Sequence, residues 1–269
     1  MKLVRVMLWF SASWVALLMA GCAVPSEGNA GAGARGEPVT ESDESDGRRR
    51  ARIRLELAAN YFQQGQTNVA LDELKQSLAA DPTYADAHNL RGLVYMRLND
   101  NALAEDSFRR AIALNPRDGD VLHNHGWLLC QQAKYSESSA MFSRALALPG
   151  YGGQAKTHMT QGICQVRAGQ LAEAEGSLTR SYELDAGNPL TGYHLASVLH
   201  QRGDFRRSQF YIRRLNNSSL ANAETLWLGV KVERALGDRE AMVQLAGQLT
   251  RRFGDSREAA AYDKGAFNE

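Results

Sequence analysis

The sequence predicts an all-α protein, a right-handed α-solenoid of about six helical repeats. Small residues recur about every 34 residues along most of the 269-residue chain. Each is followed by apolar or aromatic residues that can fill the seam between two antiparallel helices. Prolines then close the early copies, because proline cannot continue a helix. Stacked helix pairs of this kind form a solenoid whose concave face is lined by each first helix. The small residues are Ala58, Gly92, Gly126, Gly162, Ala196 and Gly229.

Residues 85–118 form the clearest copy. Gly92 and Ala104 let two helices approach closely, and Tyr95 and Phe108 fill the seam between them. Pro116 ends the unit. This spacing over 34 residues resembles the tetratricopeptide repeat (TPR), a helix–turn–helix unit. The pattern recurs one period upstream and one downstream, and it continues in three further copies after a two-residue insertion near residues 151–153.

Residues 1–21 are expected to be a signal peptide. Lys2 and Arg5 form a positive start, and the apolar run at residues 6–18 is too short to span a membrane. The sequence LMAGC at residues 18–22 resembles the bacterial lipobox, which implies that Cys22 becomes the diacylated first residue of the mature chain. Ala23 follows where an aspartate would imply retention at the inner membrane, so we expect the periplasmic face of the outer membrane. The alternative is an ordinary signal peptide cleaved nearby, with Cys22 incidental.

Four regions are predicted along the chain. Residues 1–21 are the signal peptide, and residues 22–47 are a flexible tether that is rich in small and acidic residues and has too few bulky apolar side chains to fold. Residues 48–262 are the six-repeat solenoid, and residues 263–269 are a C-terminal tail. A net charge of +1 gives no support to nucleic-acid binding, which usually shows a basic bias. We expect a monomer attached to the membrane by its N-terminal lipid.

Cys130 and Cys164 fall on the first helices of adjacent repeats, about one turn from level. Neighbouring first helices lie side by side, and an exported chain occupies a compartment that permits disulfides. The sequence therefore predicts a disulfide between them, which would stabilise the fold by roughly 2–4 kcal/mol. The alternative is a pair of buried free thiols.

Motifs of enzyme chemistry are absent from the sequence. It contains no GxSxG, HExxH, GxxxxGK[ST] or CxxC motif. His123 and His125 form an H-x-H pair, but residues two apart on a helix point in nearly opposite directions and cannot chelate one metal together. We therefore expect no catalytic residues, no metal and no cofactor.

A partner-binding groove is predicted along the first helices. Mapping the groove-facing positions of a TPR onto the first four repeats selects mostly apolar, aromatic and methionine side chains, which suit an extended or helical peptide. The alternative is that these are ordinary core residues. The selected residues are Phe62, Asn89, Leu93, Met96, His123, Trp127, Met159 and Ile163.

From Cys22 to about residue 260, the chain resembles the type IV pilus biogenesis lipoproteins PilF and PilW, the pilotins of the pilus secretin. The resemblance is carried by NHGWLLC at 124–130, QGICQVRAGQ at 161–170, LWLGVKVERALGD at 226–238 and FGDSREA at 253–259. The two cysteines also stand where family members with a disulfide between repeats three and four carry theirs. This resemblance implies a non-enzymatic protein that brings secretin subunits to the outer membrane and promotes their multimerisation. The alternative is a general periplasmic TPR scaffold for another envelope assembly machine.

Overall fold

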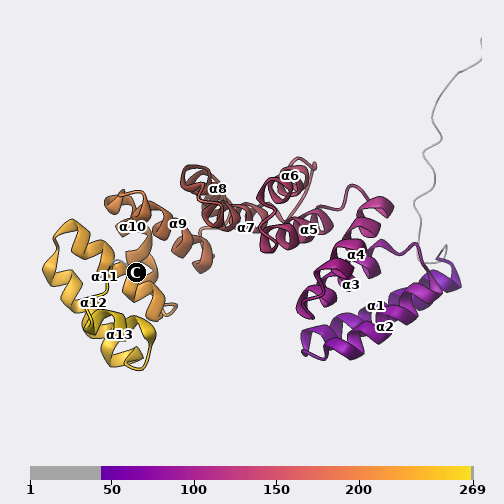
Figure 1. The fold of residues 1–269 in the computed structure, drawn as a ribbon, viewed down its shortest axis with the longest axis horizontal. Coiled ribbons are helices and arrows are strands. Elements are labelled where there is room, and N and C mark those ends of the chain that lie inside the picture. The colour runs from indigo at the N-terminus through magenta and orange to yellow at the C-terminus, as the bar shows by residue number, and fades with distance from the viewer. Residues whose placement is uncertain (1–43, 268–269) are drawn as a thin grey trace, which may run out of the picture. The chain divides into compact units, whose positions relative to one another are not determined.

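The computed structural model describes residues 44–267, and every regular element in that range is an α-helix. The first twelve helices form six pairs that follow one another along the chain, as Figure 1 shows, and a short helix follows the last pair. The first three pairs are α1 (Asp46–Gln63) with α2 (Thr67–Ala80), α3 (Ala85–Arg97) with α4 (Asn101–Leu114), and α5 (Gly119–Gln131) with α6 (Tyr135–Leu146). The next three are α7 (Gln154–Arg167) with α8 (Leu171–Leu184), α9 (Pro189–Gln201) with α10 (Phe205–Asn216), and α11 (Ala223–Leu236) with α12 (Arg239–Phe253). The short helix is α13 (Arg257–Asp263).

Each pair closes around the seam that the sequence predicts. In the second pair the ring of Phe108 is fully buried against Gly92, where a Cβ atom would come within 2.5 Å of the ring. In the fourth pair Leu178 takes the place of the aromatic residue against Gly162. The small residue is therefore required by the close approach of the two helices, and the predicted helical-repeat fold is confirmed.

Serine side chains tie the second helix of several pairs to the first. Ser138 and Ser208 donate to the carbonyl oxygens of the seam residues Gly126 and Ala196, each at 2.7 Å. Ser77 reaches back in the same way to the carbonyl of Ala51 at 2.7 Å. These serines are buried, and the hydrogen bonds satisfy hydroxyl groups that would otherwise be costly to remove from water.

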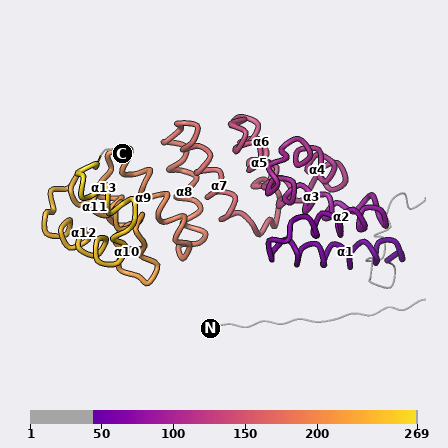
Figure 2. Tube along the Cα trace, turned by 60° about the horizontal axis from the view of Figure 1, so that its bottom comes forward, coloured from indigo at the N-terminus to yellow at the C-terminus, as the bar shows by residue number. Residues whose placement is uncertain are grey.

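The helices form two rows along the stack. The first helices α1, α3, α5, α7, α9 and α11 contact one another in sequence, and each second helix that is followed by another pair packs between two first helices. We call the first helices the inner row and α2, α4, α6, α8, α10 and α12 the outer row. Figure 2 shows the pairs succeeding one another along the chain. A surface along the inner row therefore crosses every repeat.

The two ends of the described region differ in detail from the sequence expectation. Helix α1 begins at Asp46 and is capped by Ser45, whose side chain accepts from the backbone N–H of Arg48, so the last residues of the predicted tether are helical. Helix α13 was not predicted as a separate helix; it is capped by Ser256 and packs against α11 and α12. Cys22, the signal peptide and the rest of the tether lie outside the described residues. Within residues 44–267, no helix has the length and apolar character needed to cross a membrane.

Candidate functional site

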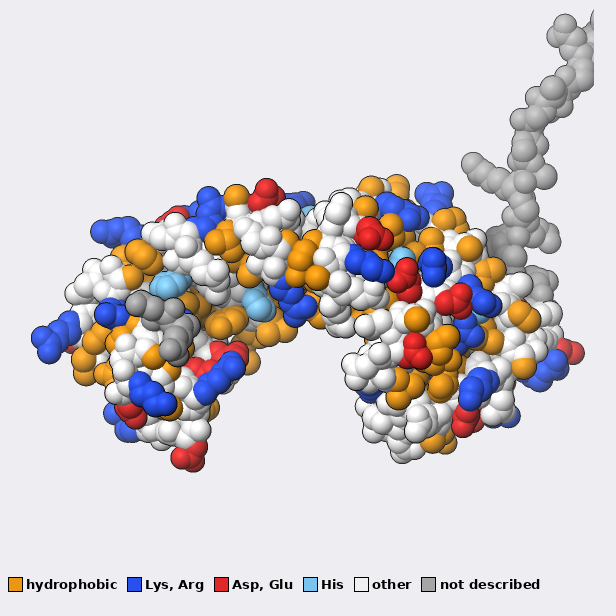
Figure 3. Space-filling model, in the orientation of Figure 1, with side chains coloured by type: hydrophobic (Ala, Val, Ile, Leu, Met, Phe, Trp, Pro, Cys, Tyr) orange, Lys and Arg blue, Asp and Glu red, His pale blue; other side chains and the backbone are white. Residues whose placement is uncertain are grey.

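All eight residues predicted to line the groove lie on the inner row, in α1, α3, α5 and α7. Seven of them are half-buried and contribute both to the core and to the surface. His123 is the exception, because its side chain is only 4% exposed and supports the surface from beneath. Figure 3 shows one face of the stack, where hydrophobic side chains are interspersed with Lys and Arg. A partner contact at these residues stays a prediction.

The first part of this surface is formed by α1 and α3. The guanidinium group of Arg97 lies over the ring of Phe62, 3.9 Å from its centre, and donates to the carbonyl oxygen of Phe62 at 2.7 Å. Leu93 and Met96 pack against the core cluster that contains Phe108. An apolar floor is thus partly covered by a cation that comes from the next repeat.

A polar chain links α3, α5 and α7 along the inner row. Asn124 donates to the side-chain oxygen of Asn89 at 3.1 Å. The Nδ1 atom of His123 lies 2.9 Å from the hydroxyl of Thr157, which in turn lies 3.0 Å from the hydroxyl of Tyr151. Burial, assisted by the positive charge of Lys156, lowers the pKa of His123 from its ordinary value to about 4. His123 is therefore held neutral at pH 7 in the folded protein.

This low pKa predicts acid sensitivity. Between pH 6.5 and about 4, the unfolded chain binds a proton at residue 123 that the folded chain does not, so stability falls as the pH falls through this window. At pH 5 the loss from this group is about 2 kcal/mol relative to pH 7. Urea unfolding at pH 5 and pH 7 measures the loss. His123→Asn keeps an acceptor near the position of Nδ1 but does not titrate, so its pH dependence should be smaller by this amount. An identical pH dependence in the variant and the parent would contradict this assignment.

The disulfide predicted between α5 and α7 is present in the structure. The sulfurs of Cys130 and Cys164 are bonded at 2.09 Å, and their Cα atoms are 5.9 Å apart. Both residues are buried beside Phe142, and Trp127 packs against the same cluster. The guanidinium group of Arg167 covers the ring of Trp127 at 4.9 Å. The bond thus crosslinks two inner-row helices beneath the predicted groove.

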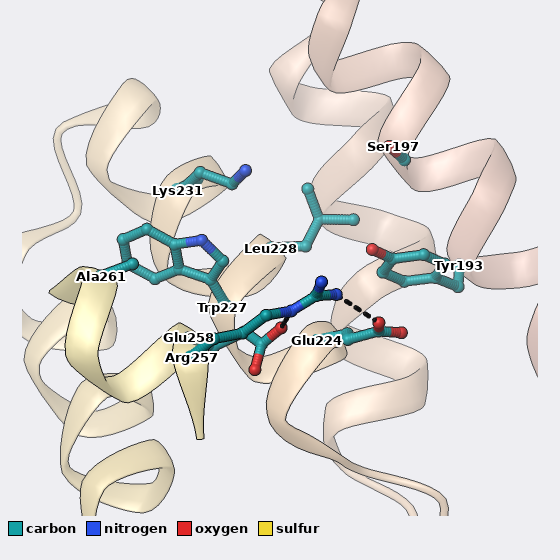
Figure 4. Close-up of a pocket in the computed structure, with 9 residues that line it drawn as sticks. All are labelled: Tyr193, Ser197, Glu224, Trp227, Leu228, Lys231, Arg257, Glu258 and Ala261. Carbon is teal, nitrogen blue, oxygen red and sulfur yellow. Dashed lines mark hydrogen bonds and ion pairs between the residues drawn. The ribbon is translucent and has the colours of Figure 1, made fainter. Parts of the chain in front are cut away.

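A pocket of about 400 Å³ lies among α9, α11 and α13, beyond most of the predicted groove. Its floor is aromatic and its rim is charged, as Figure 4 shows. The Trp227 ring packs against Phe267 at 5.3 Å and is only 7% exposed. Lys231 lies over this ring at 5.6 Å, and burial lowers its pKa. The lining residues are Tyr193, Ser197, Glu224, Trp227, Leu228, Lys231, Arg257, Glu258 and Ala261.

Helix α13 contributes the outer edge of this pocket. Arg257 donates to Glu258 at 2.7 Å and to Glu224 on α11 at 3.0 Å, so it links the two helices across the pocket rim (Figure 4). Trp227 does not stand at a groove position of the repeat pattern, and no repeat position specifies a helix that follows the last repeat. The sequence feature that could have pointed to this pocket is Trp227, an aromatic residue two positions before the seam residue Gly229.

The two histidines of the H-x-H pair lie apart in the inner row. His123 and His125 are both buried; His125 lies against Phe108 with 6.0 Å between ring centres, away from the Thr157 contact of His123. Among residues 44–267, no three metal-binding side chains come together in a group that could hold an ion. The half-buried aromatic rings, the cations above them and the amide groups provide contacts suited to a polypeptide.

Comparison with known families identifies the repeat. The model described as tetratricopeptide repeat matches residues 85–118, and a second model, described as TPR repeat, matches residues 60–99. These matches cover the second helix pair and α2, the second helix of the first pair.

Relatives of known structure and description extend the comparison to most of the chain. The chain is 26% identical over 204 residues to the type IV pilus assembly protein PilF of Pseudomonas aeruginosa, covering 76% of this chain and 81% of PilF. The crystal structure of PilW, a type IV pilus biogenesis factor, matches with a TM-score of 0.73 and 29% identity over 79% of this chain and 97% of PilW. The structure of Pseudomonas aeruginosa PilF has the same fold, with a TM-score of 0.74 and 24% identity over 82% of this chain and all of that chain. The chain is therefore a tetratricopeptide-repeat protein that is homologous to PilF and matches the structures of PilF and of the type IV pilus biogenesis factor PilW.

Proposed function

We propose that the protein is an outer-membrane pilotin, which binds subunits of the type IV pilus secretin and promotes their localisation and multimerisation. The observation that carries this proposal is the homology to PilF and PilW, which extends over about three quarters of the chain. The inner row supports it, because half-buried Phe62, Leu93 and Trp127 form an apolar surface that continues from repeat to repeat. Such a surface suits a segment of a protein partner better than a small charged metabolite.

The proposed mechanism has three parts. Acyl chains on Cys22 hold the protein at the periplasmic face of the outer membrane, since two chains suffice for stable anchoring. The tether predicted at residues 22–47, as far as the start of α1, lets the repeat stack reach a secretin subunit. The inner row then holds a segment of that subunit while neighbouring subunits assemble.

Cys22→Ala tests the anchor. We expect this variant to fold, because residue 22 precedes the repeat stack, but to be lost from outer-membrane fractions, with fewer secretin multimers. Immunoblots of separated membrane and soluble fractions measure both effects. Ala23→Ser serves as the matched control and should behave as the parent does. If Cys22→Ala still fractionates with the outer membrane, the lipid anchor is wrong.

A general periplasmic scaffold for another envelope machine is the second candidate, because the inner row alone does not specify its partner. The two candidates differ in what Trp127→Ala changes. For a pilotin, the variant should retain less secretin when it is purified from crosslinked cells. Unchanged recovery of the secretin, with loss of a different envelope protein, would favour the scaffold.

A further inference from the structure

A regular polar pattern runs along the inner row. Five residues after the seam residue of each repeat, glutamine and arginine alternate through all six copies. All six side chains are exposed, and each stands in the last turn of its inner-row helix. We call this set the Gln–Arg ladder; its members are Gln63, Arg97, Gln131, Arg167, Gln201 and Arg234.

Each of the three arginines of the ladder lies over an aromatic ring. Arg97 lies over Phe62 at 3.9 Å, Arg167 over Trp127 at 4.9 Å, and Arg234 over Phe267 at 4.0 Å. None of the three forms an ion pair with an acidic side chain of residues 44–267. An aromatic face therefore positions each guanidinium group without neutralising it.

Arginines on the outer row are used differently. Arg207 pairs with Glu175 at 2.6 Å, and Arg213 pairs with the fully buried Glu233 at 2.7 Å. Their positive charges are neutralised by ion pairs within the fold. A guanidinium group stacked on a ring keeps N–H groups along its edge that can donate to a carboxylate in a two-pronged arrangement. The ladder arginines thus have the geometry of anion-binding groups.

We propose that the Gln–Arg ladder binds an extended, acidic polypeptide segment, with carboxylates on the arginines and main-chain amides on the glutamines. Neighbouring packed helices lie about 10 Å apart, so ladder arginines two repeats apart are separated by about 20 Å. An extended chain covers that distance in about six residues. The segment therefore carries acidic side chains at about every sixth position, with apolar neighbours that contact Phe62 and Trp127. That this segment belongs to the secretin rests on the proposed function. The binding itself is measured without secretin.

The test uses purified full-length protein and a fluorescein-labelled peptide. The peptide has glutamate at about every sixth position, each beside a leucine, in a glycine–serine background. A matched peptide has glutamine in place of each glutamate. Fluorescence anisotropy should show binding of the glutamate peptide that is at least about tenfold tighter than that of the glutamine peptide and weakens with added salt. Equal affinity for the two peptides would overturn the proposal.

Substitutions locate the binding. The ladder variant Arg97→Gln/Arg167→Gln/Arg234→Gln should bind the glutamate peptide at least about tenfold more weakly than the parent. The control variant Arg117→Gln/Arg206→Gln/Arg251→Gln removes three exposed arginines that lie outside the inner row and have no ion pair, and it should change the affinity less than about twofold. Equal losses in the two variants would mean that overall charge, not the ladder, binds the peptide. If the ladder variant loses its helical circular dichroism, the three single substitutions replace it, each with an expected loss of about two- to threefold.

Three further outcomes separate this inference from others. Vesicles containing phosphatidylglycerol provide the alternative anionic surface; ladder-dependent vesicle binding without peptide binding would overturn the proposal in favour of lipid. Ladder-dependent peptide binding in a protein whose deletion leaves secretin multimers unchanged would refute the pilotin and keep the ladder. Loss of multimers on deletion, with no ladder-dependent peptide binding, would refute the ladder alone.

Discussion

Phe108→Ala will lower the free energy of unfolding by about 3–5 kcal/mol, because it removes a fully buried ring that the surrounding helices cannot replace. The ring fills the seam against Gly92 and belongs to the core cluster shared by α4 and α5. Gly92 has no side chain with which to fill the cavity, and the glycine is itself present because the ring is so close. The loss should appear as a lower urea midpoint for the transition followed by circular dichroism.

Phe210→Ala is the matched control for this substitution. Phe210 is 64% exposed on the outer-row helix α10, so the same chemical change there should alter stability by no more than about 0.5 kcal/mol. Similar losses at the two sites would mean that the seam ring of Phe108 does not hold the helix pair together. The packing of an aromatic ring against the seam glycine would then not be what stabilises the helix pair.

Removing the crosslink between α5 and α7 has the second-largest expected effect. Reduction of the Cys130–Cys164 disulfide should cost roughly 2–4 kcal/mol, since the bond joins residues separated by 34 positions and restricts the unfolded chain. Unfolding with and without a thiol reductant measures this cost. Cys130→Ala/Cys164→Ala should start from the lower stability and show no further response to reductant.

Thiol counting gives an independent check on the same bond. In a Cys22→Ala background the two remaining cysteines are Cys130 and Cys164. Denatured, unreduced protein should show no titratable thiol. Two titratable thiols would establish the alternative of buried free cysteines and would remove the expected response to reductant.

The sequence was sufficient to predict the repeat architecture. The spacing from Gly92 to Gly126 encodes one helix pair, and the seam residues Phe108 and Phe142 stand where the close approach of two helices requires them. The pairing of Cys130 with Cys164 was predictable for the same reason, because equivalent faces of adjacent inner-row helices must meet. Local, periodic packing can be inferred from a one-dimensional pattern.

The parts that escaped prediction depend on contacts outside the period. Helix α13 lies beyond the last repeat, so its role in closing the pocket beside Trp227 could not be derived from repeat positions. The burial of His123 could not be derived from repeat positions either, because it depends on contacts with Thr157 and Phe142. The stacking of Arg97 on Phe62 joins two repeats through side-chain conformations that the spacing does not specify.

The proposed promotion of secretin multimerisation is tested most directly by a gel of unheated outer-membrane fractions probed for the pilus secretin. Fractions are compared from the parent strain, a strain lacking this gene, and the same strain complemented with the gene. We predict that the heat-resistant multimer disappears on deletion and returns on complementation. Multimers that persist unchanged without the gene would contradict the pilotin function.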